Sequence, residues 1–154
     1  MSGTRFVVEE IEKAISDEWM AHYQYFLGAV IIDPKYEDVM TEFVEHSSQE
    51  YDHATELASW LWKSAERGSV PLSLDLLVRT RHCGYTVPRV ATPSGLLQDN
   101  INAETCAVEF YTGLLRDLAG RGGYFGTEII EILGWILDEE KKHLRDLQEL
   151  KLRY

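Results

Sequence analysis

The most constraining feature of this sequence is a helical face that carries the same polar residues twice. Steps of three and four residues, which follow one face of an α-helix, place Glu18 and Tyr25 in line with apolar side chains. The same steps place Glu104 and Tyr111 in an equivalent line 86 residues later (18 to 104 and 25 to 111). A face of this kind normally packs against other helices, so these polar groups are expected inside the protein.

A second pair of helices carries its own repeat. Glu50 and His53 lie on an apolar face, and Glu140 and His143 follow 90 residues later (50 to 140 and 53 to 143). The pattern indicates two copies of one helical hairpin, each with polar residues at core positions. Two such hairpins bury their apolar faces by packing into an all-α four-helix bundle.

Proline, glycine and capping residues divide the chain into these helices. Asp33-Pro34 and Thr92-Pro93 both have the form of a capping residue followed by proline at the first helical position. The helices are expected at about 7–32, 34–66, 93–120 and 127–154. Residues 67–91 contain two glycines and two prolines and are expected to form a long crossover, in which 73–80 could be a short helix. A loop of this length can span the bundle, which gives two antiparallel hairpins in a single domain of residues 1–154.

The polar residues on the four faces indicate a metal site. Charged carboxylates and imidazoles cost several kcal/mol each when they are buried and unpaired, so something has to compensate them. Two ferrous ions would bring four positive charges against four glutamates, and oxygen with imidazole nitrogen suits iron or manganese. A Glu and a His three residues apart share one helix face, so each pair can supply a carboxylate and a nitrogen. The predicted ligands are Glu18, Glu50, His53, Glu104, Glu140 and His143.

Several residues near this set have more than one interpretation. Tyr25 and Tyr111 are either packing residues or phenols that hydrogen-bond a ligating carboxylate. His22 and His46 lie on the same faces but have no counterpart in the repeat, which favours polar packing or a transient iron contact over ligation. Glu139 is expected to be solvated.

Composition narrows the function classes. The net charge of -11 argues against binding to the phosphate backbone of nucleic acids, and neither end carries a lysine-rich arm. The longest apolar stretch, residues 26–32, is too short to cross a bilayer, and the first residues lack a signal-peptide pattern, so a cytoplasmic protein is expected. Cys83 and Cys106 are too few for a disulfide framework, and their default interpretation is a pair of reduced thiols.

These residues resemble the ferritin superfamily, and bacterioferritin in particular. EWMAHYQYFLGA around Glu18 and EYDHATEL around Glu50 are similar to the first two helices of that family. The resemblance implies a site for two iron ions (Fe2+/Fe3+). Glu50 and Glu140 would be the bridging carboxylates of this site, and Glu18 and Glu104 the terminal carboxylates. His53 and His143 would supply one nitrogen ligand to each iron.

Departures from bacterioferritin indicate a different group. Bacterioferritin has a haem-ligating methionine directly after the second-helix glutamate, where this chain has Tyr51, so haem is not expected. The eleven residues after His143 (143 to 154) leave no room for the fifth helix of 24-subunit ferritins. A crossover cysteine, Cys83, and the run from Glu104 to Cys106 resemble the Dps-like thioferritins, which keep a bacterioferritin-type site in each subunit of a dodecameric shell. The two cysteines are then either a disulfide or redox pair beside the metal site, or two buried thiols.

The resemblance implies a ferroxidase and iron-storage miniferritin. Such a protein oxidises Fe(II) with hydrogen peroxide or dioxygen, keeps the ferric product in a homo-oligomeric shell and protects against oxidative stress. A manganese-type catalase, or a diiron oxidase without storage, stays open as the alternative. A structural or DNA-condensing shell is disfavoured because the termini lack basic arms.

Overall fold

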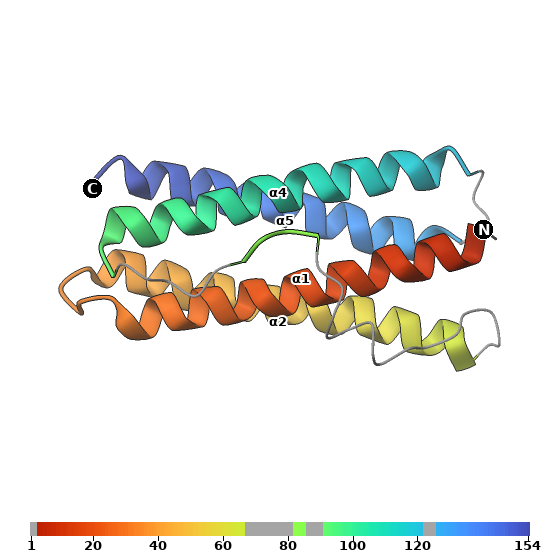
Figure 1. Ribbon diagram of the computed structural model, residues 1–154, viewed down its shortest axis with the longest axis horizontal. Coiled ribbons are helices and arrows are strands. Elements are labelled where there is room, and N and C mark those ends of the chain that lie inside the picture. Colours follow the sequence, from red (N-terminus) through yellow and green to blue (C-terminus); the bar gives the residue numbers. More distant parts are fainter. Residues whose placement is uncertain (1–2, 67–81, 86–90, 122–125) are drawn as a thin grey trace.

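The computed structural model describes residues 3–66, 82–85, 91–121 and 126–154. Most of them belong to four long helices, which are α1 (Gly3–Ile31), α2 (Glu37–Glu66), α4 (Pro93–Ala119) and α5 (Thr127–Lys151). Figure 1 shows the helices side by side along the long axis of the molecule. The prediction of an all-α four-helix bundle is confirmed.

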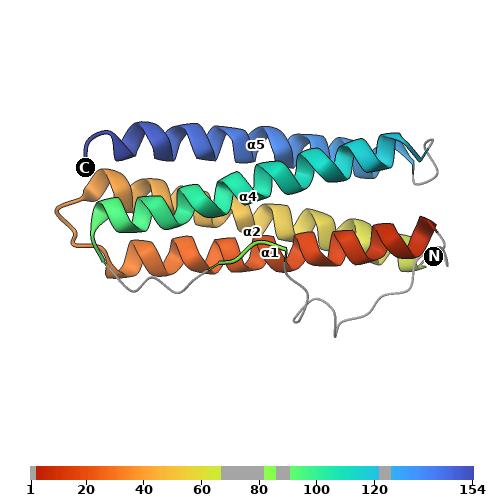
Figure 2. The ribbon, with the colours of Figure 1, turned by 45° about the horizontal axis from the view of Figure 1, so that its top comes forward.

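The helices form two antiparallel hairpins, α1 with α2 and α4 with α5, which pack on each other (Figures 1 and 2). The end of α2 and the start of α4 lie at opposite ends of the bundle, so the connection between them has to cross its length, as predicted. The short helix predicted at 73–80 lies outside the described residues. None of the described helices has the length and apolarity that a membrane span requires.

The second hairpin begins and ends where the local sequence rules place it. Thr92 caps α4, its Oγ1 accepting a hydrogen bond from Gly95 N at 3.2 Å, and proline occupies the first position of the helix. The helix ends before Gly120, and α5 begins at Thr127. These short-range signals are therefore sufficient for the α4–α5 hairpin.

The turn between α1 and α2 differs from its prediction. α2 begins at Glu37, three residues after the predicted start at Pro34. Asp33 closes a tight turn instead, because its carboxylate accepts a hydrogen bond from Lys35 N and its carbonyl accepts one from Tyr36 N, both at 3.0 Å. An aspartate before a proline suits such a turn as well as it suits a helix cap, and here the turn is formed.

A layer of polar residues divides the apolar core into two clusters. The cluster near the start of α1 includes Val7, Ile11, Leu61, Leu114 and Leu133. The cluster near the end of α1 includes Ile32, Phe43, Leu96, Leu97 and Leu147. Burying a large apolar side chain contributes about 1.5–3 kcal/mol, so the two clusters supply most of the free energy that holds the helices together. They fix the four helices on both sides of the polar layer.

Candidate metal centre

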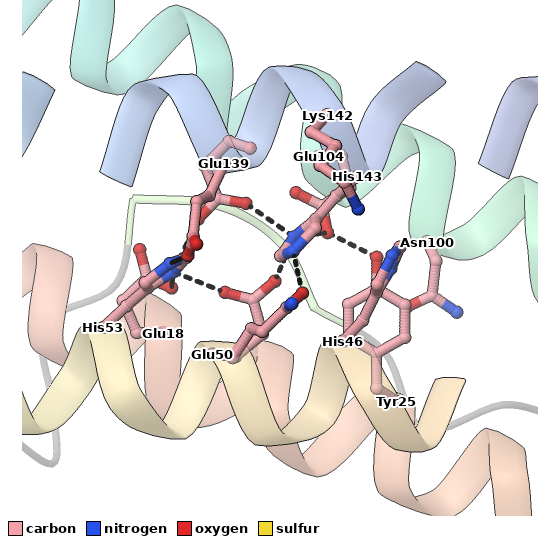
Figure 3. A network of polar contacts seen from close by, with 12 residues as sticks. Glu18, Tyr25, His46, Glu50, His53, Asn100, Glu104, Glu139, Lys142 and His143 are labelled. Atoms are coloured by element: carbon pink, nitrogen blue, oxygen red, sulfur yellow. Dashed lines mark hydrogen bonds and ion pairs between the residues drawn. The ribbon is translucent and has the colours of Figure 1, made fainter. Parts of the chain in front are cut away.

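The polar layer brings the six predicted ligands together in the middle of the bundle. None of the six residues is more than 3% exposed. α1 and α4 each supply one glutamate, while α2 and α5 each supply a Glu-x-x-His pair whose two side chains point the same way. Figure 3 shows the side chains converging between the helices. The six residues are Glu18, Glu50, His53, Glu104, Glu140 and His143.

Four of these residues form a first group around His53. One ligand atom from each of Glu18, Glu50, His53 and Glu140 lies within 4.8 Å of the others. His53 Nδ1 is 3.1 Å from Glu50 Oε2, 3.2 Å from Glu140 Oε1 and 3.3 Å from Glu18 Oε2. A metal ion among these atoms would have three carboxylates and one imidazole nitrogen as ligands.

A second group surrounds His143 in the same way. His143 Nδ1 is 3.1 Å from Glu50 Oε1, 3.2 Å from Glu140 Oε2 and 3.5 Å from Glu104 Oε1. Glu50 and Glu140 belong to both groups, and each of them offers one oxygen to His53 and the other oxygen to His143. This arrangement is compatible with two metal ions that share two carboxylates.

Two buried tyrosines hold the remaining carboxylates from the opposite hairpin. Tyr25 of α1 donates a hydrogen bond to Glu104 of α4, and Tyr111 of α4 donates one to Glu18 of α1. Both tyrosines are 1% exposed. Of the two interpretations of these tyrosines, the geometry supports hydrogen bonding to the carboxylates.

The outer nitrogens of the two histidines also have partners across the bundle. His53 Nε2 lies 2.5 Å from Glu139 Oε2, and His143 Nε2 lies 2.7 Å from Gln49 Oε1. These contacts fix the ring orientation and leave Nδ1 for a metal. The expectation that Glu139 is solvated holds only in part, since its side chain is 30% exposed and also contacts His53. The repeat could have revealed the pair, because Gln49 and Glu139 are 90 residues apart (49 to 139), like the ligands beside them.

Burial and mutual repulsion raise the proton affinity of the two terminal carboxylates. Burial is the largest cause of the raised pKa of Glu18, followed by repulsion from Glu140 and Glu50. The same causes, in the same order, raise the pKa of Glu104. The metal-free site therefore favours the neutral, protonated form of both groups.

The pKa values of the two histidines are raised, whereas the pKa values of the two shared carboxylates are lowered. Burial alone would lower the pKa of His53 and His143, but three surrounding carboxylates raise each of them well above the ordinary value of 6.5. Burial would likewise raise the pKa of Glu50 and Glu140, but contacts with the two histidines lower both. Protons thus supply positive charge where a metal ion would supply it.

The residues fit a site for two metal ions. Both carboxylate oxygens of Glu140 are buried and lack a hydrogen bond to another described residue, and their nearest cationic partners are the histidine Nδ1 atoms, each 3.2 Å from one oxygen. Leaving a buried polar group without a hydrogen bond costs about 1–3 kcal/mol, and more when it is charged, so a cation between the oxygens would compensate it. Carboxylate oxygen with imidazole nitrogen suits iron or manganese.

The two histidines without repeat counterparts behave differently from each other. His22 Nδ1 is 2.8 Å from the carbonyl oxygen of Ser47 and lies outside both groups of ligands, which is ordinary polar packing. His46 is fully buried and stacks on His143 with ring centroids 4.0 Å apart. His46 is therefore next to the centre without belonging to either group of four.

Residues 82–85 pass over the middle of the bundle in the view of Figure 1. Cys83 and Cys106 form a disulfide with their Cα atoms 5.9 Å apart, which replaces the default interpretation of two reduced thiols. The carboxylate of Asp17 accepts hydrogen bonds from His82 N at 3.0 Å and Cys83 N at 3.1 Å. Asp17 directly precedes the predicted ligand Glu18 in α1 and Cys106 lies two residues after the predicted ligand Glu104 in α4, so this segment is fixed to both helices at the level of the site.

The fold and the site define the class of this protein. Residues 8–152 match the family model of the ferritin-like domain. The chain therefore belongs to the ferritin family, and the resemblance to the ferritin superfamily is confirmed. The four long described helices and the buried cluster of glutamates and histidines agree with this membership.

Within the family, the chain is similar to a solved thioferritin. This relative is the bacterioferritin-related protein from Bacteroides fragilis, described as a dodecameric thioferritin. The two chains are 29% identical with a TM-score of 0.78, over 96% of this chain and 84% of the other. A search of curated protein sequences gave no match.

Proposed function

We propose that this protein is a ferroxidase of the miniferritin type, which oxidises Fe(II) at the candidate centre and stores the ferric product. The observation that supports it most directly is the sharing of Glu50 and Glu140 between the two groups of ligand atoms. Two ions held side by side by common carboxylates can each give one electron to the same oxidant. Glu18 and Glu104 would be terminal ligands, positioned by the tyrosines of the opposite hairpin.

Hydrogen peroxide is the proposed oxidant. Two Fe(II) ions lose one electron each, the O–O bond of one peroxide breaks, and two protons complete two water molecules. The step consumes Fe(II) and peroxide together, so it removes both reagents that otherwise produce hydroxyl radicals. With dioxygen, the same two electrons and two protons yield hydrogen peroxide instead, so the two oxidants leave different products.

The test is anaerobic loading with about two Fe(II) per chain, the number of metal positions in the site, followed by peroxide or dioxygen in separate experiments. The expected result is rapid formation of ferric absorbance, faster with peroxide. Glu50→Gln should abolish the rapid phase, because it removes a carboxylate shared by both positions. Glu131→Gln makes the same chemical change at an exposed position of α5 and should leave the rate unchanged. An equal rate in wild type and Glu50→Gln contradicts the proposal.

The same ligands would also accept two manganese ions, which corresponds to the alternative function of a catalase without storage. A manganese-loaded protein that releases oxygen continuously from peroxide, and forms no ferric mineral after repeated Fe(II) additions, would favour this alternative. Mineral that accumulates with each addition would favour the miniferritin.

Storage requires a shell, and α1 carries a surface suited to self-association. Trp19, Tyr23, Phe26 and Val30 follow one exposed face of the helix, and each is at least 46% exposed. Tyr51 of α2 extends this surface, with its ring 6.3 Å from that of Trp19. Large apolar patches on a protein surface commonly mark interfaces. Because the similar solved protein is a dodecamer, we propose a second copy of this chain as the occupant, within a dodecameric shell.

Size-exclusion chromatography with light scattering tests the assembly. We expect a particle of about twelve chains, each of 17.7 kDa. Phe26→Glu should dissociate it, because a buried, unpaired carboxylate is costly, while Phe26→Tyr should retain it. A wild-type monomer contradicts the proposed shell without affecting the proposed site.

A further inference from the structure

A second cation-binding feature lies one helical turn from the candidate centre. It comprises Glu42 and His46 of α2 with Asp146 of α5, whose ligand atoms lie within 4.8 Å of one another. Residues three or four apart share one face of a helix, as Glu42 and His46 do in α2 and His143 and Asp146 do in α5. Glu42, His46 and Asp146 therefore face the same groove between the two helices. None of these three is among the six residues of the dinuclear site.

His46 is the residue that distinguishes this cluster from an ordinary group of surface acids. It is 0% exposed, and neither ring nitrogen makes a hydrogen bond with another described residue. Nε2 lies 2.8 Å from Glu42 Oε1, close enough for an ion pair, and Nδ1 has no partner of this kind among the described residues. A buried imidazole without hydrogen bonds is costly, so its presence beside two carboxylates indicates a ligand that the nitrogen can bind.

The cluster opens into a polar cavity of about 330 Å³. Glu42 and Asp146 reach the solvent there, with side chains 28% and 30% exposed. Five carboxylates line the cavity against two cations, Lys142 and Arg153, which leaves a net charge of about three negative units. A cation arriving from solvent is attracted to such a place.

The same histidine also faces the dinuclear centre. His46 belongs to a second close group with Glu104 and His143, and its ring stacks on that of His143. Figure 3 shows His46 beside His143, at the edge of the group of candidate ligands. One buried imidazole therefore contacts both His143 of the proposed dinuclear site and Glu42, which lines the acidic cavity.

We propose that Glu42, His46 and Asp146 bind a third, mononuclear divalent metal ion, and that iron leaves the dinuclear centre through this position. One imidazole and two carboxylates, with water completing the shell, suit Fe(II) or Mn(II). Passage of iron through the position rests on the proposed ferroxidase function, whereas binding of the third ion does not.

Mn(II) titration of the metal-free assembled protein, followed by equilibrium dialysis and electron paramagnetic resonance, tests the site. The expected result is three Mn(II) per chain, with the six-line signal of an isolated ion beside the signal of a coupled pair. The double variant Glu42→Gln/Asp146→Asn should lose the isolated ion and keep the pair. The matched control Glu45→Gln/Glu149→Gln removes the same charge from the same cavity and should keep all three ions.

Three outcomes would overturn the site. They are binding of only two ions by wild type, survival of the isolated signal in Glu42→Gln/Asp146→Asn, and its equal loss in both double variants, which would show diffuse charge attraction only. Circular dichroism of each variant verifies its folding. Because the readout uses Mn(II) without oxidant, it is independent of whether the protein oxidises iron.

A gain-of-binding variant adds a test that misfolding cannot imitate. Lys142 Nζ forms an ion pair with Asp146 Oδ2 at 2.9 Å, so it competes with a metal ion for this carboxylate. Lys142→Gln should therefore tighten binding of the third Mn(II) at least about twofold, since removing an ion pair frees the ligand. Unchanged or weaker binding would remove Asp146 from the site.

Repeated additions of Fe(II) and peroxide test the passage of iron. If ferric ions leave through His46, the fast phase of a second addition should be smaller in Glu42→Gln/Asp146→Asn than in the control pair, because the dinuclear centre empties more slowly. Equal recovery in both variants would overturn the route while leaving the third metal site intact.

Discussion

Gln49 and Glu139 occupy equivalent positions in the two hairpins, and each contacts the outer nitrogen of the histidine supplied by the other hairpin. One partner is a neutral amide and the other is a carboxylate, although the ligands around them repeat. A carboxylate that accepts the outer N–H strengthens an imidazole as a metal ligand. The two proposed metal positions are therefore chemically different, and the position of His53 should bind the first ion.

Glu139→Gln should remove this difference. We expect the tighter of the two dinuclear Mn(II) or Co(II) equivalents to weaken by about tenfold, the usual lower limit for loss of an outer contact of this kind. Gln49→Glu should instead tighten the weaker equivalent at the position of His143. Anaerobic titration followed by calorimetry measures both changes. Identical, equally strong binding of two ions in wild type and Glu139→Gln would contradict the inequivalence.

The tyrosine contacts allow a second prediction, about stability without metal. Tyr111→Phe removes the hydrogen bond to Glu18 and leaves a buried carboxylate with fewer donors. The metal-free protein should lose about 1–3 kcal/mol of unfolding free energy, as measured by urea denaturation. Tyr25→Phe should act similarly through Glu104. If neither variant is destabilised, the phenols are packing residues only.

The six candidate ligands were accessible from the sequence because periodicity identifies the buried face of a helix. A glutamate on such a face is informative in itself, and its recurrence at a fixed distance identifies its equivalents, as for Glu18 and Glu104. Periodicity says much less about residues at the edge of a buried face. Gln49 and Glu139 lie there, and only the packing of α2 against α5 shows which histidine each one contacts.

The sequence pattern also did not determine whether the two cysteines form a disulfide. Nothing in the spacing of Cys83 and Cys106 decides between free thiols and a bond, because the distance between them depends on the path of the crossover. Asp33-Pro34 shows the same limit at short range, since one dipeptide suits a cap and a turn equally well.

The close approach of α1 and α2 gives a third prediction. A Cβ atom at Gly28 would lie 2.8 Å from two ring carbons of Phe43, which is itself fully buried. Gly28→Ala should therefore destabilise the protein by about 1–3 kcal/mol through overpacking. Gly134 is the matched control in α5, where an added Cβ meets no described atom within 4 Å. Gly134→Ala should stabilise the protein by about 0.5–1 kcal/mol, because alanine favours the helix. Thermal unfolding of both variants measures these changes in stability. A Gly28→Ala variant as stable as wild type would show that the two helices can move apart to accept the methyl group.

The disulfide gives a fourth prediction. It joins cysteines 23 residues apart, and a loop of this size restricts the unfolded chain enough to contribute about 3 kcal/mol to stability. Cys83→Ser/Cys106→Ser should lower the free energy of unfolding by about that amount. Dithiothreitol should lower the stability of wild type similarly and leave the double variant unchanged. A wild-type protein that keeps its full stability although both thiols have become free under the reductant would contradict a stabilising role.

The proton content of the metal-free centre gives the last prediction. Burial raises the pKa of Glu18 and Glu104, and the carboxylates raise the pKa of His53 and His143. The folded, metal-free site therefore holds more protons than the unfolded chain above the ordinary values of 4.5 and 6.5, so its stability should fall as the pH rises above about 6.5.

Metal binding reverses this dependence, because an ion must displace those protons from its ligands. Loading with two Mn(II) should release about two to four protons per chain, and the apparent affinity should rise with pH between about 6 and 8. Calorimetry in buffers of different ionisation enthalpy measures the release directly, and the gain in melting temperature on metal addition should grow over the same interval. Affinity that is independent of pH would mean that the ligands are already deprotonated. The pKa shifts of the buried glutamates and histidines would then have the wrong sign, and the charge in the metal-free bundle would have to be balanced by cations other than protons.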